Sequence, residues 1–193
     1  KSQKKLSIIL KDEIVFFINN LGDVTALDVN NGSLVWQTPT QSNLIYQDSF
    51  SLENSDLVFA NNNIYFSNNK NEFFSIDARN GLIKWIQSVN SSLRPTIIDS
   101  LIFTISNEGY LFVIDDRTGN ILRITDILKN IKNKANVEPT GFIHCKYKIY
   151  VSLNNGQLVI VNSSTGIQEK ITKFHGSKIS RPFIFKNSMY LIK

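Results

Sequence analysis

The 193-residue sequence predicts an all-β fold, a partial β-propeller of four-stranded antiparallel blades with about four blades and the first two strands of a fifth. Three observations lead to this prediction: one motif recurs four times, two short β-rich runs precede each copy, and turn-forming residues separate the runs. The motif is clearest in "ALDVNNGSLVW" (26–36) and "SIDARNGLIKW" (75–85). In both copies an Asp stands four positions before a Gly, and a Trp stands four positions after it.

The four copies align on their turn glycines. They read "DVTALDVNNGSLVW", "NEFFSIDARNGLIKW", "GYLFVIDDRTGNILR" and "GQLVIVNSSTGIQEK", with glycines at Gly32, Gly81, Gly119 and Gly166. The residues four positions before these glycines are Asp28, Asp77, Asp115 and Asn162, and those ten positions before are Gly22, Asn71, Gly109 and Gly156. Two turn signals at a fixed separation predict a short strand held between two chain reversals.

Two further strands are expected upstream of each motif. The first strands are expected at 6–10, 57–60, 96–98 and 141–144, and the second strands at 14–18, 64–67, 101–105 and 149–153. The resulting units span approximately 6–37, 55–86, 94–124, 139–171 and, in part, 181–193, as one segment of a larger ring. Four-stranded units that recur about every 40 to 50 residues are typical of propeller blades.

One stretch between units departs from the β pattern. The segment "TDILKNIK", 125–132, is expected to be helical, with Thr125 as its N-cap.

The motif itself is predicted to be structural. Gly supplies a positive φ in the hairpin, and the Asp before it accepts hydrogen bonds from the turn amides. The indole covers the gap to the next blade, where a small residue such as Ala26 or Ser75 leaves room. Burial of such a side chain stabilises a fold by about 3 kcal/mol. The motif residues are Ala26, Asp28, Gly32, Trp36, Asp77, Gly81, Trp85, Asp115, Gly119 and Gly166.

The pattern A-x-D-x-x-x-G-x-x-x-W resembles the tryptophan-docking repeat of the PQQ-like (quinoprotein) β-propellers. The first copy matches fully and the second has Ser75 in place of Ala, whereas Arg123 and Lys170 replace Trp in the third and fourth copies. Within this superfamily the chain is most similar to the BamB family of outer-membrane protein assembly factors. That resemblance implies a non-catalytic periplasmic scaffold, lipid-anchored to the outer membrane in the full-length protein, that binds the POTRA domains of BamA.

The resemblance also implies candidate partner-binding residues. A Leu-Arg pair in a loop that enters a blade's first strand helps BamB-like proteins to hold BamA, and Leu93 and Arg94 stand at a comparable place. The alternative is a plain strand-entry role, because Arg181-Pro182 occupies the equivalent point further along the chain. Members of the family form eight-bladed rings, so missing blades or a second copy would be needed to close this one. The absence of a lipoprotein Cys from Lys1-Ser2 also fits a truncated piece.

Composition excludes several other classes. The formal charge is +5, but the Lys residues are scattered without a basic stripe, so no nucleic-acid partner is expected. Cys145 is the single cysteine, which excludes an intrachain disulfide and CxxC metal sites. No apolar run approaches the roughly 20 residues that span a bilayer.

No catalytic, cofactor-binding or metal-binding residues are expected. His144 and Cys145 are neighbours on a predicted strand and point to opposite faces, while His175 lies in a loop. The pair Asp115-Asp116 is assigned to the repeat and its hairpin in preference to a cation site. Two alternative functions stay open: a fragment of a PQQ-dependent dehydrogenase whose cofactor residues lie elsewhere, and a ligand-sensing propeller domain.

Overall fold

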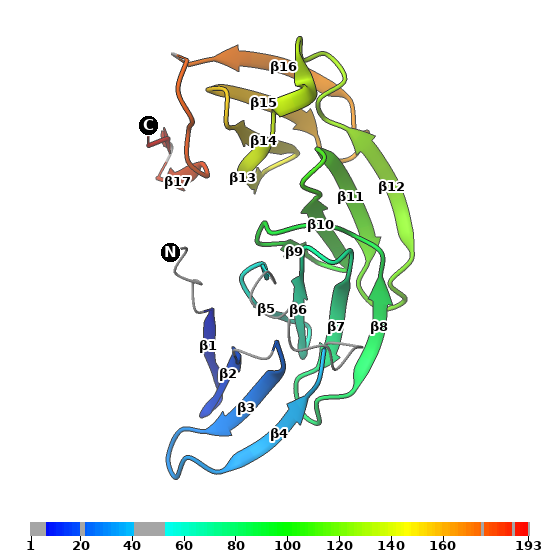
Figure 1. Ribbon diagram of the computed structural model, residues 1–193, viewed down its shortest axis with the longest axis vertical. Helices are drawn as coiled ribbons and strands as arrows, with labels where there is room; N and C mark the ends of the chain where they lie inside the picture. Colours follow the sequence, from blue (N-terminus) through cyan, green and yellow to red (C-terminus); the bar gives the residue numbers. More distant parts are fainter. Residues whose placement is uncertain (1–6, 20–21, 41–52, 175, 187, 193) are drawn as a thin grey trace. The chain divides into compact units, whose positions relative to one another are not determined.

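The computed structural model describes residues 7–19, 22–40, 53–174, 176–186 and 188–192. Its strands form four four-stranded antiparallel sheets and one two-stranded sheet, and in each sheet neighbouring strands are consecutive in the chain (Figure 1). The predicted all-β fold is therefore confirmed. The sheets fall into two compact units, Lys1–Pro95 and Thr96–Lys193.

The first unit contains two sheets. Blade 1 consists of β1 (Ile8–Lys11), β2 (Ile14–Ile18), β3 (Val24–Asp28) and β4 (Leu34–Thr38). Blade 2 consists of β5 (Val58–Ala60), β6 (Asn63–Ser67), β7 (Phe73–Asp77) and β8 (Ile83–Gln87).

The second unit contains the other three sheets. Blade 3 consists of β9 (Thr96–Ile98), β10 (Leu101–Ile105), β11 (Tyr110–Asp115) and β12 (Ile121–Asp126). After a 3₁₀ turn, η2 (Lys134–Asn136), blade 4 consists of β13 (Pro139–Cys145), β14 (Lys148–Leu153), β15 (Gln157–Asn162) and β16 (Gln168–Lys173). The two-stranded sheet pairs β17 (Phe183–Phe185) with β18 (Ser188–Tyr190).

The first hairpin of each blade is a two-residue connection that needs left-handed backbone. In blade 2 both connecting residues have positive φ, 48° at Asn61 and 58° at Asn62. Asn tolerates this region better than most side chains, and turns with positive φ match the twist of the flanking strands. The two Asn residues of this hairpin therefore have a structural role.

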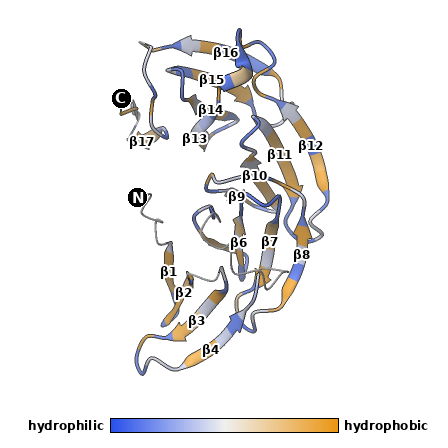
Figure 2. Ribbon diagram, in the orientation of Figure 1, coloured by the Kyte–Doolittle hydropathy of each residue, from blue (hydrophilic) through white to orange (hydrophobic). Residues whose placement is uncertain are grey.

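The middle strands form the core, and the outer strands are the most exposed. Every residue of β6 and β7 is buried, whereas most of β8 is not. The outer strands β4, β8 and β12 still carry apolar residues, which are orange in Figure 2. Exposed examples are Leu34, Val35, Ile83, Ile86, Leu122 and Ile124.

The prediction of a helix at 125–132 is wrong. Thr125 and Asp126 continue β12, where they pair with Leu111 and Tyr110 of β11. The apolar residues that suggested a helix are buried in a turn instead: Leu128 covers Gly109, where an added Cβ would lie 2.5 Å from the Leu128 Cδ1. Tertiary burial has overridden the helical spacing of these residues.

Candidate functional site

The hairpin between the third and fourth strands shows why the Asp–Gly spacing recurs. In blade 1 the Gly32 N–H donates to the Asp28 carbonyl oxygen at 2.8 Å, and Gly32 has a φ of +70°. The Asp28 Oδ1 accepts from the Asn30 N–H at 2.8 Å. The Asp28 carboxylate therefore stabilises the turn by a hydrogen bond, and Gly32 allows the positive φ that the turn requires.

The other three hairpins repeat this bonding with different side chains. The Asp77 Oδ1 accepts from the Arg79 N–H at 2.9 Å, and the Asp115 Oδ1 accepts from the Thr118 N–H at 2.7 Å. In blade 4 the Asn162 Oδ1 accepts from two turn amides at 3.0 Å. An amide oxygen does the same work as a carboxylate here, so the fourth copy keeps its turn without an Asp.

A β-bulge stands at the same place in all four blades. Ala26 pairs with Trp36, but the next residue, Leu27, pairs with Leu34, so Val35 is the extra residue on β4. The register shifts at the same point in blades 2, 3 and 4, and in each case the extra residue directly precedes the Trp position. Bulges re-aim side chains and increase local twist. This feature of the motif was not anticipated from the sequence.

Trp36 lies between blades 1 and 2. Its indole is 8% exposed, tilts against Phe16 with ring centroids 5.8 Å apart, and donates from Nε1 to the Ala78 carbonyl oxygen of blade 2 at 3.0 Å. Opposite it on β3 stands the fully buried Ala26. The first motif copy thus joins two blades by both apolar contact and a hydrogen bond.

Gly81 receives this indole. A Cβ at Gly81 would lie 2.7 Å from the Trp36 Cε3 and 2.7 Å from the Thr38 Oγ1, so no side chain fits there without a shift. The Thr38 hydroxyl donates to the Gly81 carbonyl oxygen at 2.5 Å. Glycine at this position therefore serves the turn of blade 2 and the contact with blade 1 together.

Asp77 lies close to two cationic side chains of its own blade. Its buried carboxylate binds the Arg79 guanidinium at 2.9 Å and lies 3.5 Å from the Lys84 ammonium. The hydrogen bond from Arg79 holds the pKa of the Asp77 carboxyl well below its usual range. Trp85, on β8, stacks on Phe73 of its own blade with ring centroids 5.9 Å apart.

In the second unit Arg123 occupies the Trp position and still bridges two blades. Its Nη1 and Nη2 donate to the carbonyl oxygens of Ser164 and Ser163 in blade 4. Ser163 follows Asn162 as Ala78 follows Asp77, so the guanidinium reaches the equivalent of the carbonyl that Trp36 reaches. A Cβ at Gly166 would lie 3.0 Å from the Arg123 Nε, which reproduces the close approach seen at Gly81.

The third copy is thus a polar version of the same contact, although the aligned residue types alone show only a departure from the pattern. One signal could have identified it: Thr125 follows Arg123 at the spacing by which Thr38 follows Trp36.

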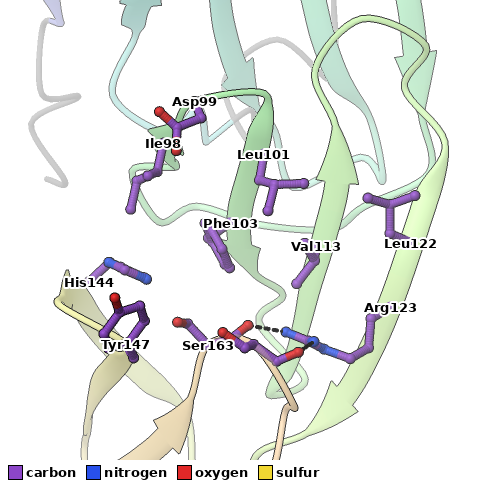
Figure 3. A pocket seen from close by; sticks show the side chains of 11 residues that line it. Ile98, Asp99, Leu101, Phe103, Val113, Leu122, Arg123, His144, Tyr147 and Ser163 are labelled. Carbon is purple, nitrogen blue, oxygen red and sulfur yellow. Dashed lines mark hydrogen bonds between the residues drawn. The ribbon is translucent and has the colours of Figure 1, made fainter.

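A cavity of about 560 Å³ opens beside Arg123, between blades 3 and 4. Apolar residues of blade 3, among them Leu101, Phe103 and Val113, line one side of it (Figure 3). His144 and Tyr147 of blade 4 line the other side, and the His144 ring lies 5.1 Å from that of Phe103. This cavity was not anticipated from the sequence.

The partner-binding candidates lie directly before β9. Leu93 is half-buried, with its N–H donating to the Ser91 Oγ at 3.1 Å, whereas Arg94 is exposed. The comparable Arg181 is anchored within its own unit, because its Nε donates to the Phe142 carbonyl oxygen at 3.0 Å and its Cβ covers Gly141. Arg94 makes no ion pair within the part of the chain that the structure describes.

The remaining titratable candidates do not gather into one site. Asp115 is committed to Thr118, and the described residues hold no group of three or more His, Cys, Asp and Glu side chains that could bind a metal ion. His144 faces Phe103, and its strand neighbour Cys145 is a half-buried free thiol. His175 lies outside the described residues. Among the described residues, no helix has both the length and the apolar character to span a membrane.

Comparison with known proteins places this geometry in a family. The family model described as outer membrane protein assembly factor BamB matches residues 2–125, which include both Trp-containing motif copies and the loop with Leu93 and Arg94. The chain belongs to this family. No curated protein sequence matches the chain.

Solved structures share the fold at low identity. The crystal structure of BamB from Moraxella catarrhalis has a TM-score of 0.59 at 15% identity, over 95% of this chain and 68% of that one. The β-propeller domain of Myceliophteria thermophila Cps50 (Swd1) has a TM-score of 0.71 at 10% identity, over 95% of this chain and 60% of that one. The computationally designed Ika8 protein has a TM-score of 0.69 at 14% identity, over 96% of this chain and 54% of that one. The fold is therefore that of a β-propeller, and the chain spans between about half and two thirds of these structures.

Proposed function

We propose that the chain is a non-catalytic, BamB-like scaffold in the periplasm that takes part in outer-membrane β-barrel protein assembly by binding another protein. The observation that carries the proposal is the family match over residues 2–125, which spans both indole-bearing motif copies and the 93–94 loop. The polar residues of the motif support it, since they are engaged in turns and in contacts between blades. A propeller held together in this way offers its loops as a binding surface.

The partner we propose is the POTRA region of a BamA-like insertase, bound in part through Leu93 and Arg94. The structure supports this choice in one respect, because Arg94 is exposed and follows a half-buried apolar residue in the chain. Arginine is one of the residue types that are enriched in binding hot spots.

The proposal is tested by measuring binding of the chain to purified POTRA domains of BamA from the same organism, by calorimetry or biolayer interferometry. Arg94→Glu is expected to weaken binding at least tenfold, about 1.4 kcal/mol. Lys173→Glu is the matched control, since it reverses an equally exposed positive charge at the end of β16 and should leave the affinity unchanged.

Two results would contradict the proposal. One is a folded chain that does not bind POTRA domains at all. The other is dye-linked oxidation of an alcohol or sugar that starts when PQQ and Ca²⁺ are added, which would refute the non-catalytic assignment.

A further inference from the structure

The region between blades 3 and 4 can be compared residue by residue with the region between blades 1 and 2. In the first unit Phe16 pairs with Ala26, and Ala26 pairs with Trp36. In the second unit Phe103 pairs with Val113, and Val113 pairs with Arg123. Phe59 and His144 each stand two positions before the first hairpin turn of the following blade and face the second-strand Phe, with ring centroids 6.3 Å and 5.1 Å apart.

The aromatic content of the two regions differs. Between blades 1 and 2 the indole of Trp36 and the rings of Phe16 and Phe59 belong to one hydrophobic cluster. Between blades 3 and 4 the indole is replaced by the narrow Arg123 side chain, and the Phe59 equivalent is an imidazole. Arg123 restores the hydrogen bonds to the next blade without the bulk of two fused rings, and the cavity of about 560 Å³ lies beside it.

The polar groups of this cavity are basic or neutral, apart from Asp99 in the β9–β10 turn. Two of the five N–H groups of Arg123 are bonded to Ser163 and Ser164, and its buried Nε has no hydrogen-bond partner among the described residues. Burial lowers the pKa of His144, so its imidazole is mostly neutral near pH 7. Arg123 is therefore the residue of the cavity that stays positively charged at neutral pH.

We propose that the cavity between blades 3 and 4 is a binding site for a small aromatic carboxylate. The aromatic part would take the place that an indole holds between blades 1 and 2. There it would contact the half-buried Leu101 and the exposed Leu122, since Phe103 and Val113 are almost fully buried by the protein itself. The carboxylate would face the Arg123 guanidinium, with His144 and Tyr147 across the cavity (Figure 3). Both the cavity volume and the mixture of apolar walls with a few polar groups are typical of small-ligand sites.

The probes are indole-3-acetate, indole and acetate, each titrated into the chain by calorimetry. Indole-3-acetate is expected to bind at one site per chain, at least tenfold more tightly than indole, because only the acid gains a charge-assisted bond to Arg123. Acetate is expected not to bind detectably, because it lacks the ring. Equal affinity for indole and indole-3-acetate would overturn the assignment, as would no binding of either.

Two variants locate the site. The double variant Val113→Ala/Arg123→Trp rebuilds the Ala26–Trp36 pair inside the cavity and should abolish ligand binding. The control Lys170→Trp adds an indole at the same motif position of blade 4, outside the cavity, and should leave ligand binding unchanged. Arg123→Gln removes the charge while keeping an N–H donor for the Ser163 carbonyl, so indole and indole-3-acetate should then bind alike. Undiminished binding to the rebuilt double variant, or a persistent preference for the acid in Arg123→Gln, would refute the proposal.

Discussion

Substitution of two motif glycines measures how much the contact between blades 1 and 2 contributes to the free energy of unfolding. Gly32 and Gly81 occupy the same position in successive hairpins, with φ of +70° and +75°. A Cβ at Gly32 would meet no atom within 4 Å, whereas at Gly81 it would meet Trp36 and Thr38 at 2.7 Å. Replacement by Ala therefore imposes the same backbone strain at both positions and a clash at only one.

The expected magnitudes follow from these two terms. Ala in the left-handed region costs about 1–2 kcal/mol, which is the whole expected loss in the free energy of unfolding for Gly32→Ala. Gly81→Ala adds an overpacking cost of about 1–3 kcal/mol, because the new methyl must displace a buried indole. Gly81→Ala is thus expected to destabilise the chain by about 2–5 kcal/mol.

Urea unfolding followed by tryptophan fluorescence, with both variants at matched concentration, measures the difference. A third and a fourth variant, Trp36→Leu and Trp36→Leu/Gly81→Ala, complete a double-mutant cycle. With the indole gone, most of the excess loss at Gly81 should disappear. Equal losses for Gly32→Ala and Gly81→Ala, or no coupling between positions 36 and 81, would refute the view that the indole is docked on this glycine.

Three further outcomes are expected. Asp77→Asn should destabilise the chain at neutral pH, and its difference in stability from wild type should shrink as the pH falls below about 4. The reason is that the lowered pKa of Asp77 stabilises the fold only where the carboxyl is ionised in the unfolded chain. Urea midpoints between about pH 2.5 and 7 check this, and a difference that stays constant with pH would contradict it. Arg123→Ala should cost about 3 kcal/mol in the same unfolding assay, since it removes two partly exposed hydrogen bonds from a charged group at about 1.5 kcal/mol each. Arg117→Ala, in the exposed β11–β12 turn, is the control and should cost less than about 0.5 kcal/mol. Val113→Ala and Arg123→Trp should be coupled favourably in a double-mutant cycle by at least about 0.5 kcal/mol, since Val113 stands where Ala26 leaves room for an indole, and strictly additive effects would exclude this packing.

Hairpins and motif turns could be predicted from the sequence because their causes are local. A Gly four positions after an Asp or Asn encodes both the positive φ and its hydrogen-bond acceptor within one turn. The bulge before Trp36 was not anticipated, because it depends on how β3 and β4 pair and not on any single residue. The helix expected at 125–132 is absent for a related reason, since Leu128 is buried against Gly109 of the β10–β11 turn and not by helical neighbours.

Arg123 shows where the comparison of motif letters loses information. Aligned by residue type, the third copy has lost its Trp, yet in space its guanidinium bonds to the carbonyl oxygen of Ser163, the counterpart of Ala78. The hydrogen bond and the glycine that allows a close approach are both kept, and only the aromatic volume is gone. A contact between blades therefore has two separable parts, a polar link to the next hairpin and a filled space beside it. In the first unit the Trp36 indole supplies both the polar link and the side-chain volume that fills the space. The second unit retains the link and leaves the space open, which is the physical basis for expecting a ligand there.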